Sequence, residues 1–275
     1  MTRDLRALFD PRSVAVLGAS SVPGKWGFWL ARGAIKGDGR RSVYLVNRKG
    51  GEIFGRKAYT ALDQLPEPPE FVVITVPAAG LEEAVEASLA AGAKALVAIS
   101  AGLGEMGAEG AARERAIAER VRAAGAVLVG PNCLGVYDAE AELELCSEDL
   151  EPGSIGLISQ SGNLALEIGM VGAAFGLGFS RFVSLGNQAD VAAAELVESF
   201  AAHEPTKLIA VYLEDFQDGR AFARAGRAAV EAGTPVVLLA GGATEASARA
   251  ARSHTGALAS GRASIEAACL ASGIE

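Results

Sequence analysis

The sequence predicts an α/β protein made of two successive units, each built around a parallel, doubly wound sheet. Short apolar runs alternate with longer amphipathic segments along the whole chain, which is the pattern of strands and helices in such sheets. The 275 residues include 34 glycines, which suit tight turns between strands and helices. An acidic segment that ends in Pro152-Gly153 interrupts the alternation and divides the chain.

The first unit is expected to span residues 1–138. Its strands are predicted over the apolar runs 13–18, 43–46, 71–76, 95–99 and 126–129. Its helices are predicted near 26–35 and over 81–91 and 109–124. Near-continuous apolar strands separated by amphipathic helices indicate a sheet that is covered on both faces.

Residues 139–153 are expected to form a linker. The stretch around them is rich in acids, namely Asp138, Glu140, Glu142, Glu144, Glu148, Asp149 and Glu151. The second unit, 154–275, repeats the strand-and-helix rhythm. Its strands are predicted at 155–159, 180–184, 208–213 and 235–239, and its helices at 164–174, 192–202, 219–232 and from about 257 onward.

Composition limits the classes of function. The net charge of −8 argues against general nucleic-acid binding, although backbone amides and a few local cations can still hold a phosphate. No apolar run approaches the roughly 20 residues that a membrane span needs, and the N-terminus lacks the apolar core of a signal peptide. The three cysteines show no CxxC spacing. We therefore expect a cytoplasmic protein with reduced cysteines, no membrane segment and no metal ligands.

The loop from Gly18 to Gly27 follows the first strand and opens a helix, which is where sheets of this type bind phosphate. It is not a GxGxxG fingerprint, because Ser20 replaces the second glycine, and it is not a P-loop, which would need glycine at position 19 and serine or threonine at position 26. The second strand is followed by Arg48 and Lys49 rather than by an acid, which favours a ligand with a phosphate on its ribose, as in NADP or coenzyme A. The alternative is a phosphate-free scaffold with exposed basic residues.

Two further turns follow predicted strands. Gly130-Pro131-Asn132-Cys133-Leu134-Gly135 either lines a site or joins the two units, and Cys133 is interpreted as a buried structural thiol rather than a nucleophile. Ser161 and Gly162 lie at a strand-to-helix junction, where free N–H groups and the helix dipole can hold a phosphate. Helix capping by Ser161 is compatible with that role, and the GxSxG elbow pattern is not met.

The chain has two histidines. His203 lies in a polar helix-end turn and is expected at the surface. His254 lies between small residues before a predicted helix, where a neutral imidazole can attack phosphorus. A carboxylate must then orient the ring, and Glu214, at the end of strand 208–213, is the best candidate. A capping or structural role for His254 is equally consistent with its residue chemistry.

Eight stretches, in this order, resemble the NDP-forming acyl-CoA synthetases, the superfamily of succinyl-CoA synthetase α subunits and ADP-forming acetyl-CoA synthetases. They are Ser13–Ser20, Val46-Asn47, Ile99–Gly102, Gly130–Gly135, Ile158–Gly162, Ser184–Asn187 with Asp190, Tyr212–Glu214 and Ser253–Leu258. The resemblance spans nearly the whole chain. It implies a Rossmann-like domain that binds coenzyme A, followed by a flavodoxin-like ligase domain of the succinyl-CoA synthetase type.

The resemblance also implies roles for residues. The coenzyme A site would include the loop Gly18, Ala19, Ser20 and Ser21, a cation at Arg48 or Lys49, and the turn Ile99, Ser100 and Ala101. In the second domain His254 would accept the phosphoryl group, Glu214 would orient it, and Ser161 and Gly162 would offer amides to the phosphate. The family makes acyl-CoA from a carboxylic acid, coenzyme A and a nucleoside triphosphate by way of an acyl phosphate and a phosphohistidine.

The family resemblance further implies a partner, because nothing in the chain resembles an ATP-grasp domain. Magnesium and ATP/ADP or GTP/GDP are therefore expected on a β-type subunit or domain, with a small carboxylic acid as substrate and an oligomer as the assembled form. One departure stands out: the run Leu239-Ala240-Gly241-Gly242-Ala243 lacks the lysine that relatives commonly carry there. It favours the alternative of a catalytically reduced, coenzyme-A-binding regulatory module. A third hypothesis, an NADP-dependent oxidoreductase, follows from Arg48 and Lys49 but leaves His254 unexplained.

Overall fold

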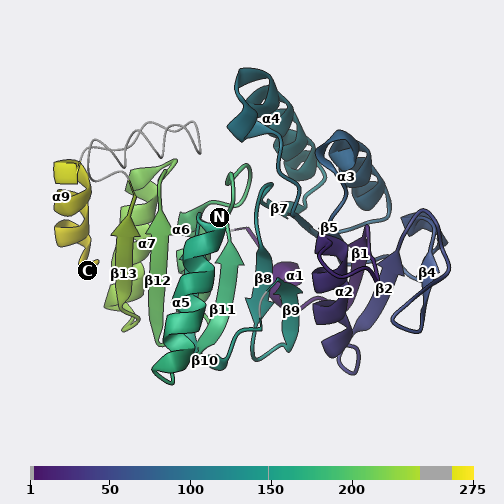
Figure 1. The fold of residues 1–275 in the computed structure, drawn as a ribbon. Helices are drawn as coiled ribbons and strands as arrows, with labels where there is room; N and C mark the ends of the chain where they lie inside the picture. The colour runs from purple at the N-terminus through teal and green to yellow at the C-terminus, as the bar shows by residue number, and fades with distance from the viewer. Residues whose placement is uncertain (1–2, 148, 242–261) are drawn as a thin grey trace.

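The computed structural model describes residues 3–147, 149–241 and 262–275, which form two sheets side by side (Figure 1). The first sheet has the strand order β3-β4-β2-β1-β5-β6-β7. Its strands are β1 (Ser13–Leu17), β2 (Ser42–Val46), β3 (Glu52–Ile53), β4 (Arg56–Tyr59), β5 (Phe71–Ile74), β6 (Ala95–Ala98) and β7 (Val127–Val129). All neighbouring pairs are parallel except β3 with β4. The sequence did not predict that short pair, and it did predict the other five strands.

Helices and 3-10 turns connect these strands. They are α1 (Arg6–Phe9), α2 (Trp26–Lys36), η1 (Leu62–Gln64), η2 (Ala78–Gly80), α3 (Leu81–Ala90), η3 (Gly104–Met106) and α4 (Ala108–Ala123). The chain runs from β1 to β2 on one side and later returns to β5 on the other side of β1. Such a reversal of direction leaves a crevice at the carboxyl ends of the strands, which is the usual ligand site of this architecture.

The second sheet has the order β13-β12-β10-β11-β8-β9. Its elements are β8 (Gly135–Asp138), β9 (Leu143–Cys146), β10 (Pro152–Ser159), α5 (Gly162–Ala174), β11 (Phe179–Ser184), α6 (Ala193–Ala201), β12 (Leu208–Leu213), α7 (Gly219–Glu231), β13 (Val236–Ala240) and α9 (Arg262–Ser272). The four strands β10 to β13 pair in parallel. Their reversal point lies between β10 and β12, so the second crevice opens beside the ends of those two strands.

The acidic middle segment is not simply a linker. It contains β9, which pairs antiparallel with β8, while β8 pairs antiparallel with β11. Leu143 and Leu145 are buried and alternate with the more exposed Glu142 and Glu144, the period-two pattern of an edge strand. The high acid content concealed this alternation from the sequence analysis.

The acids of that segment join the two units. Helix α2 packs against β9 so closely that a Cβ added to Gly33 would lie 2.0 Å from the carbonyl oxygen of Glu144. Lys36 forms ion pairs with Glu144 and, at 2.6 Å, with Asp149. Arg32 pairs with Asp149 at 2.7 Å. The charge of the segment therefore complements the basic face of α2.

A second junction is centred on Asp190, in the loop after β11. Its carboxylate is fully buried and accepts hydrogen bonds from Arg3 at 2.7 Å and from Arg122, near the end of α4, at 2.6 Å. It also accepts the backbone N–H of Leu128 in β7 at 2.8 Å. One side chain of the second unit thus connects three segments of the first.

Helix α5 covers one face of the second sheet, and α6 and α7 cover the opposite face (Figure 1). Much of the surface of α5 and the turn after it is apolar and exposed. Met170, Val171, Phe175 and Leu177 have exposed fractions of 67%, 56%, 78% and 49%. Glu167 is the single charged residue within the helix.

Candidate functional site

A cavity of about 630 Å³ occupies the crevice at the carboxyl ends of β1, β2 and β5. Gly18, Arg48 and Lys49 line it, so the structure brings these three predicted residues together. Gly18 has a φ of +96°, and a Cβ there would lie 2.5 Å from the Thr75 hydroxyl oxygen. Only glycine permits both the backbone conformation and the close approach of the loop to β5.

The other predicted residues of the first loop make contacts that hold the conformation of the loop. Ala19 is buried in the core, and its carbonyl accepts a hydrogen bond from the Asn47 side chain at 2.7 Å. The Ser20 hydroxyl accepts the N–H of Val22 at 3.0 Å, and Ser21 is exposed. Ala19, Ser20 and Ser21 are not among the described residues that line this cavity or the cavity between the two units. Their contacts indicate that Ala19 and Ser20 fix the loop's conformation.

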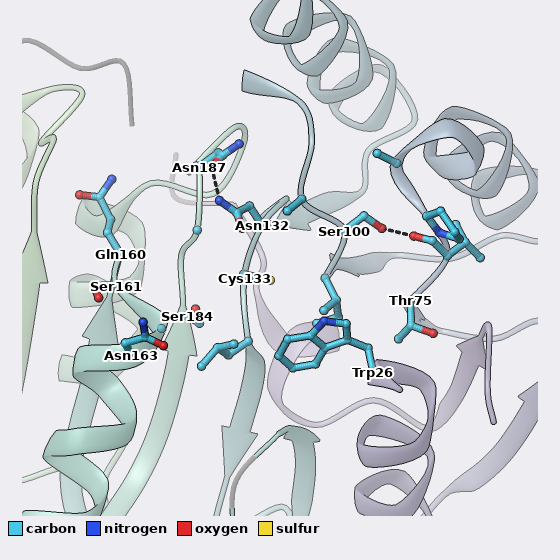
Figure 2. A pocket seen from close by; sticks show the side chains of 18 residues that line it. Trp26, Thr75, Ser100, Asn132, Cys133, Gln160, Ser161, Asn163, Ser184 and Asn187 are labelled. Carbon is cyan, nitrogen blue, oxygen red and sulfur yellow. Dashed lines mark hydrogen bonds between the residues drawn. The ribbon is translucent and has the colours of Figure 1, made fainter. Parts of the chain in front are cut away.

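A second cavity, of about 470 Å³, lies between the two units (Figure 2). The turn Ile99, Ser100 and Ala101 lines it from the first unit, and Ser161 and Gly162 line it from the second. Residues Thr75, Val76 and Pro77 line both cavities, so the two are neighbours. The structure therefore connects the predicted coenzyme A residues with the predicted phosphate-binding turn, although they are far apart in sequence.

Ser161 and Gly162 form the start of α5. The Ser161 hydroxyl caps the helix by accepting the N–H of Leu164 at 3.3 Å. A Cβ on Gly162 would lie 2.7 Å from Cγ of Leu134, which belongs to the turn between the units. The N-terminus of a 13-residue helix thus faces the cavity with its positive dipole end.

Glu214, at the end of β12, lies next to Gln160, one of the polar residues that line this cavity. Gln160 lines the cavity, and its Oε1 accepts the backbone N–H groups of Glu214 at 2.6 Å and Asp215 at 2.9 Å. The Tyr212 hydroxyl donates to Glu214 Oε1 at 3.2 Å. Burial and the neighbouring Glu214 raise the pKa of Tyr212 to about 12, so the phenol keeps its proton at neutral pH.

His254 lies outside the described residues, as do Gly242 and Ala243 of the Leu239–Ala243 departure. Gly241, the last described residue before that segment, packs against the predicted carboxylate. A Cβ on Gly241 would lie 3.0 Å from both Cγ of Glu214 and the Tyr212 hydroxyl oxygen. The backbone N–H of Gly241 donates to Leu213 at 2.7 Å. The chain therefore enters the histidine segment directly beside Glu214.

Two predictions about reactive side chains have opposite outcomes. Cys133 is buried, its thiol donates to the Ala98 carbonyl at 3.3 Å, and burial raises its pKa to about 12, which confirms a structural thiol. The prediction of an exposed His203 is wrong. Its Nδ1 lies 2.9 Å from the Thr206 hydroxyl and its Nε2 lies 3.2 Å from Glu140. The turn after α6 folds inward, which buries the ring despite its polar neighbours.

A polar cluster that the sequence analysis missed borders the cavity between the units. The Asn187 amide donates to Glu105 and to Glu114, each at 2.8 Å, and accepts from Asn132 at 3.2 Å. Burial raises the pKa of Glu114. Burial alone would raise the pKa of Glu105 as well, but hydrogen bonds from the Gly102 N–H and the Asn187 amide outweigh it and lower that pKa.

Comparisons with known proteins agree with this geometry. Residues 12–139 match the CoA binding domain, and residues 152–275 match the succinyl-CoA ligase like flavodoxin domain. The chain is 39% identical to the alpha subunit of the ADP-forming acetate–CoA ligase I of Pyrococcus furiosus, over 98% of this chain and 60% of that protein. It is 37% identical to the ADP-forming acetate–CoA ligase I of Archaeoglobus fulgidus, over 98% of this chain and 39% of that protein.

A solved structure shows the same fold. The dinucleotide forming acetyl-coenzyme A synthetase 1 of Ca. Korarchaeum cryptofilum, in complex with phosphate and ADP, superposes with a TM-score of 0.92 at 33% identity, covering 98% of this chain and 59% of that one. The chain thus spans about 60% of the alpha subunit that it matches in Pyrococcus furiosus. With a coenzyme-A-binding domain followed by a succinyl-CoA-ligase-like flavodoxin domain, the chain belongs to the NDP-forming acyl-CoA synthetase family and corresponds to the alpha-subunit-like portion of its ADP-forming members.

Proposed function

We propose that this chain is the alpha-type part of an acid–thiol ligase that makes acyl-CoA from a carboxylic acid, coenzyme A and a nucleoside triphosphate. It would work in the cytoplasm, in an oligomer with an ATP-grasp subunit or domain that holds magnesium and ATP/ADP or GTP/GDP. The family membership supports the reaction class, and the two neighbouring cavities support the place of the reaction.

The residues fit coenzyme A. The 630 Å³ cavity lies in the crevice that this architecture uses for nucleotides, and Arg48 and Lys49 at its edge supply positive charge for phosphate. In this proposal the thiol arm of the coenzyme passes Thr75, Val76 and Pro77 into the neighbouring 470 Å³ cavity, which the start of α5 lines. When bound, coenzyme A supplies the thiol that attacks the activated acyl group.

The proposed chemistry transfers one phosphoryl group through His254. A nitrogen of the neutral ring attacks the γ-phosphorus of the triphosphate, and the diphosphate leaves. A carboxylate oxygen of the acid then attacks the phosphorus, the P–N bond breaks, and an acyl phosphate forms. The thiol finally attacks the acyl carbon, inorganic phosphate leaves, and the thiol proton passes to solvent. Glu214 orients the imidazole, and the amides of Ser161 and Gly162 hold the phosphate.

One observation supports this proposal most directly: the α5 N-terminus and Gln160 line the same cavity, and Gln160 accepts the backbone N–H of Glu214 at 2.6 Å. The test is phosphorylation of the chain by labelled ATP in the presence of its ATP-grasp partner and magnesium. We expect an acid-labile, base-stable label that His254→Asn abolishes. Glu214→Gln should slow labelling by roughly 100-fold, because the ring loses its orienting carboxylate.

The other histidine provides the matched control. His203→Gln alters a buried ring that lies away from the two cavities, so it should leave the label in place. Circular dichroism would show that the variant is folded. If His254→Asn is labelled as strongly as the parent, the phosphohistidine assignment is wrong. Tight coenzyme A binding without labelling under any partner condition would favour the regulatory module instead, as the run Leu239–Ala243 without lysine suggests.

A further inference from the structure

Trp26 is a large aromatic side chain that lines a cavity rather than the core. It begins α2, it is 43% exposed, and it lines the cavity between the units. In contrast, Trp29, one turn further along α2, packs against the hydrophobic core. Figure 2 shows the indole of Trp26 reaching from the first unit toward the turn between β7 and β8 that carries Cys133. An exposed indole on a cavity wall offers a flat apolar contact to whatever occupies the cavity.

The backbone under Trp26 is held rigidly. A Cβ on the next residue, Gly27, would lie 2.0 Å from the carbonyl oxygen of Gly18, so the start of α2 presses directly on the first loop. The Gly27 carbonyl accepts the N–H of Ser20 at 3.1 Å, and the Lys25 carbonyl accepts the N–H of Phe28 at 2.9 Å. With its Cα fixed by these contacts, the indole cannot leave the cavity without a change of rotamer.

The cavity has two chemically different walls. On the side of Trp26, the first unit contributes the apolar Val76, Pro77 and Ile99 together with Thr75 and Ser100, and Leu134 of the joining turn adds a further apolar contact (Figure 2). Uncharged polar side chains line the other wall, namely Gln160, Ser161, Asn163, Ser184 and Asn187. Among the described lining residues there is no lysine, arginine, histidine, aspartate or glutamate. A second carboxylate on the acid would therefore meet no countercharge from them, and an unpaired charge is costly to bury.

We infer that the indole of Trp26 packs against the acyl group of the substrate and limits the size of that group. The substrate is a monocarboxylic acid with no charge along its chain. The inference rests on the proposed function, since it places the acyl carbon where the thiol path meets the start of α5. The reacting carboxyl end faces the polar wall, and the rest of the acid faces Trp26 and Leu134. Dicarboxylic acids are poor substrates because the wall around their second carboxylate is apolar or neutral.

The test compares acids at fixed coenzyme A, using the full enzyme with its ATP-grasp partner. In Trp26→Ala, removal of the indole should raise the ratio of kcat/KM for phenylacetate to that for acetate by about tenfold or more. The KM for coenzyme A should stay within about threefold of the parent value. Succinate should remain a poor substrate of both forms. Trp29→Phe is the matched control and should leave the ratio unchanged.

The other possible results contradict either this inference or the proposed function. If Trp26→Ala weakens all acids equally and raises the KM for coenzyme A, Trp26 contacts the coenzyme and the inference is wrong. An unchanged ratio in an active enzyme contradicts the inference and leaves the proposed function intact. A parent enzyme that is inactive with every acid overturns the proposed function itself.

A second measurement needs no turnover. The chain has two tryptophans, so Trp29→Phe leaves Trp26 as the only indole. Acetyl-CoA, whose acyl group fits beside the indole, should shift the fluorescence of that variant to shorter wavelength, whereas coenzyme A alone should not. Equal shifts with both ligands would place the coenzyme arm, rather than the acyl group, against Trp26.

Discussion

At the scale of single residues, the amide of Asn187 is shared between two carboxylates from the first unit. It donates to Glu105 and Glu114 at 2.8 Å each, and the Gly104 N–H also donates to Glu114 at 3.1 Å. Burial raises the pKa of Glu114. The hydrogen bonds that Glu105 accepts lower the pKa of Glu105 itself. Of the two carboxylates, Glu114 therefore holds its proton more tightly than Glu105 does.

This arrangement predicts the pH dependence of Glu114→Gln. The pKa of Glu114 is raised above its ordinary 4.5 in the folded protein, so the unfolded chain loses the proton at a lower pH. The contribution of Glu114 to stability is therefore complete below that value and decreases as the pH rises through the folded pKa. Glutamine cannot ionise and can accept the same hydrogen bonds.

We expect Glu114→Gln to be more stable than the parent at pH 8, by up to about 1 kcal/mol, and the advantage to vanish near pH 4. Urea unfolding at both pH values measures this. Glu119→Gln, on the same helix, is the control and should show no such trend. A variant that is less stable at pH 8 would mean that the ionised carboxylate is the preferred partner of Asn187.

At the scale of elements, the loop between β1 and α2 contains two glycines with a positive φ. One of them is also in close steric contact with a neighbouring strand, and the other is not. Gly18 has a φ of +96° and lies against Thr75. Gly24 has a φ of +83°, but a Cβ there would meet no atom within 4 Å. The two positions therefore separate backbone strain from steric contact.

Gly18→Ala should lower the affinity for coenzyme A by tenfold or more, because the methyl group displaces the loop from β5 at the edge of the cavity. Gly24→Ala carries a similar conformational cost, on the order of 1 kcal/mol, and should leave affinity nearly unchanged. Isothermal titration with coenzyme A measures both. Equal losses of affinity would show that strain in the loop, rather than its contact with Thr75, controls binding.

At the scale of the whole molecule, the buried carboxylate of Asp190 connects the N-terminal segment, α4 and β7 with the second unit. Asp190→Asn should lower the free energy of unfolding by about 2–3 kcal/mol, because Arg3 and Arg122 lose their shared anion. Thermal denaturation measures the loss. Glu86→Gln breaks the exposed pair with Arg120 and should cost less than about 0.5 kcal/mol. An equally small cost in Asp190→Asn would show that the contacts of α2 with β9 and Asp149, rather than Asp190, join the units.

Much of this architecture was predictable from the sequence. The central strands are near-continuous apolar runs, and β5 and β6 are buried along their whole length. The misses were edge elements. The pair β3–β4 is too short to show a period, and Glu144, the acid of β9, pairs with Lys36 of α2 rather than facing solvent alone. Burial of His203 depends on Thr206 and on the distant Glu140, and local polarity does not reveal such a contact.

The candidate site was predictable as separate turns but not as one place. Gly18, Ser100 and Ser161 each follow a predicted strand, and the carboxyl ends of parallel strands are where ligands bind. Ser100 and Ser161 line one cavity between the units, and Gly18 lines the neighbouring one. This arrangement depends on how the sheets are packed, which is set by α2 against β9 and by the bonds of Asp190. Trp26 was noted only as part of a helix, since no periodicity shows that its indole faces a cavity.

The exposed apolar side of α5 has a consequence for the behaviour of the isolated chain in solution. Met170, Val171 and Phe175 form an exposed apolar surface that favours association between molecules. The net charge of −8 opposes association by electrostatic repulsion at low ionic strength. Added salt screens that repulsion and leaves the attraction between such surfaces in place. Preparations of the chain alone should therefore cloud and scatter light as salt is raised, and dilute, low-salt buffers should keep them clear.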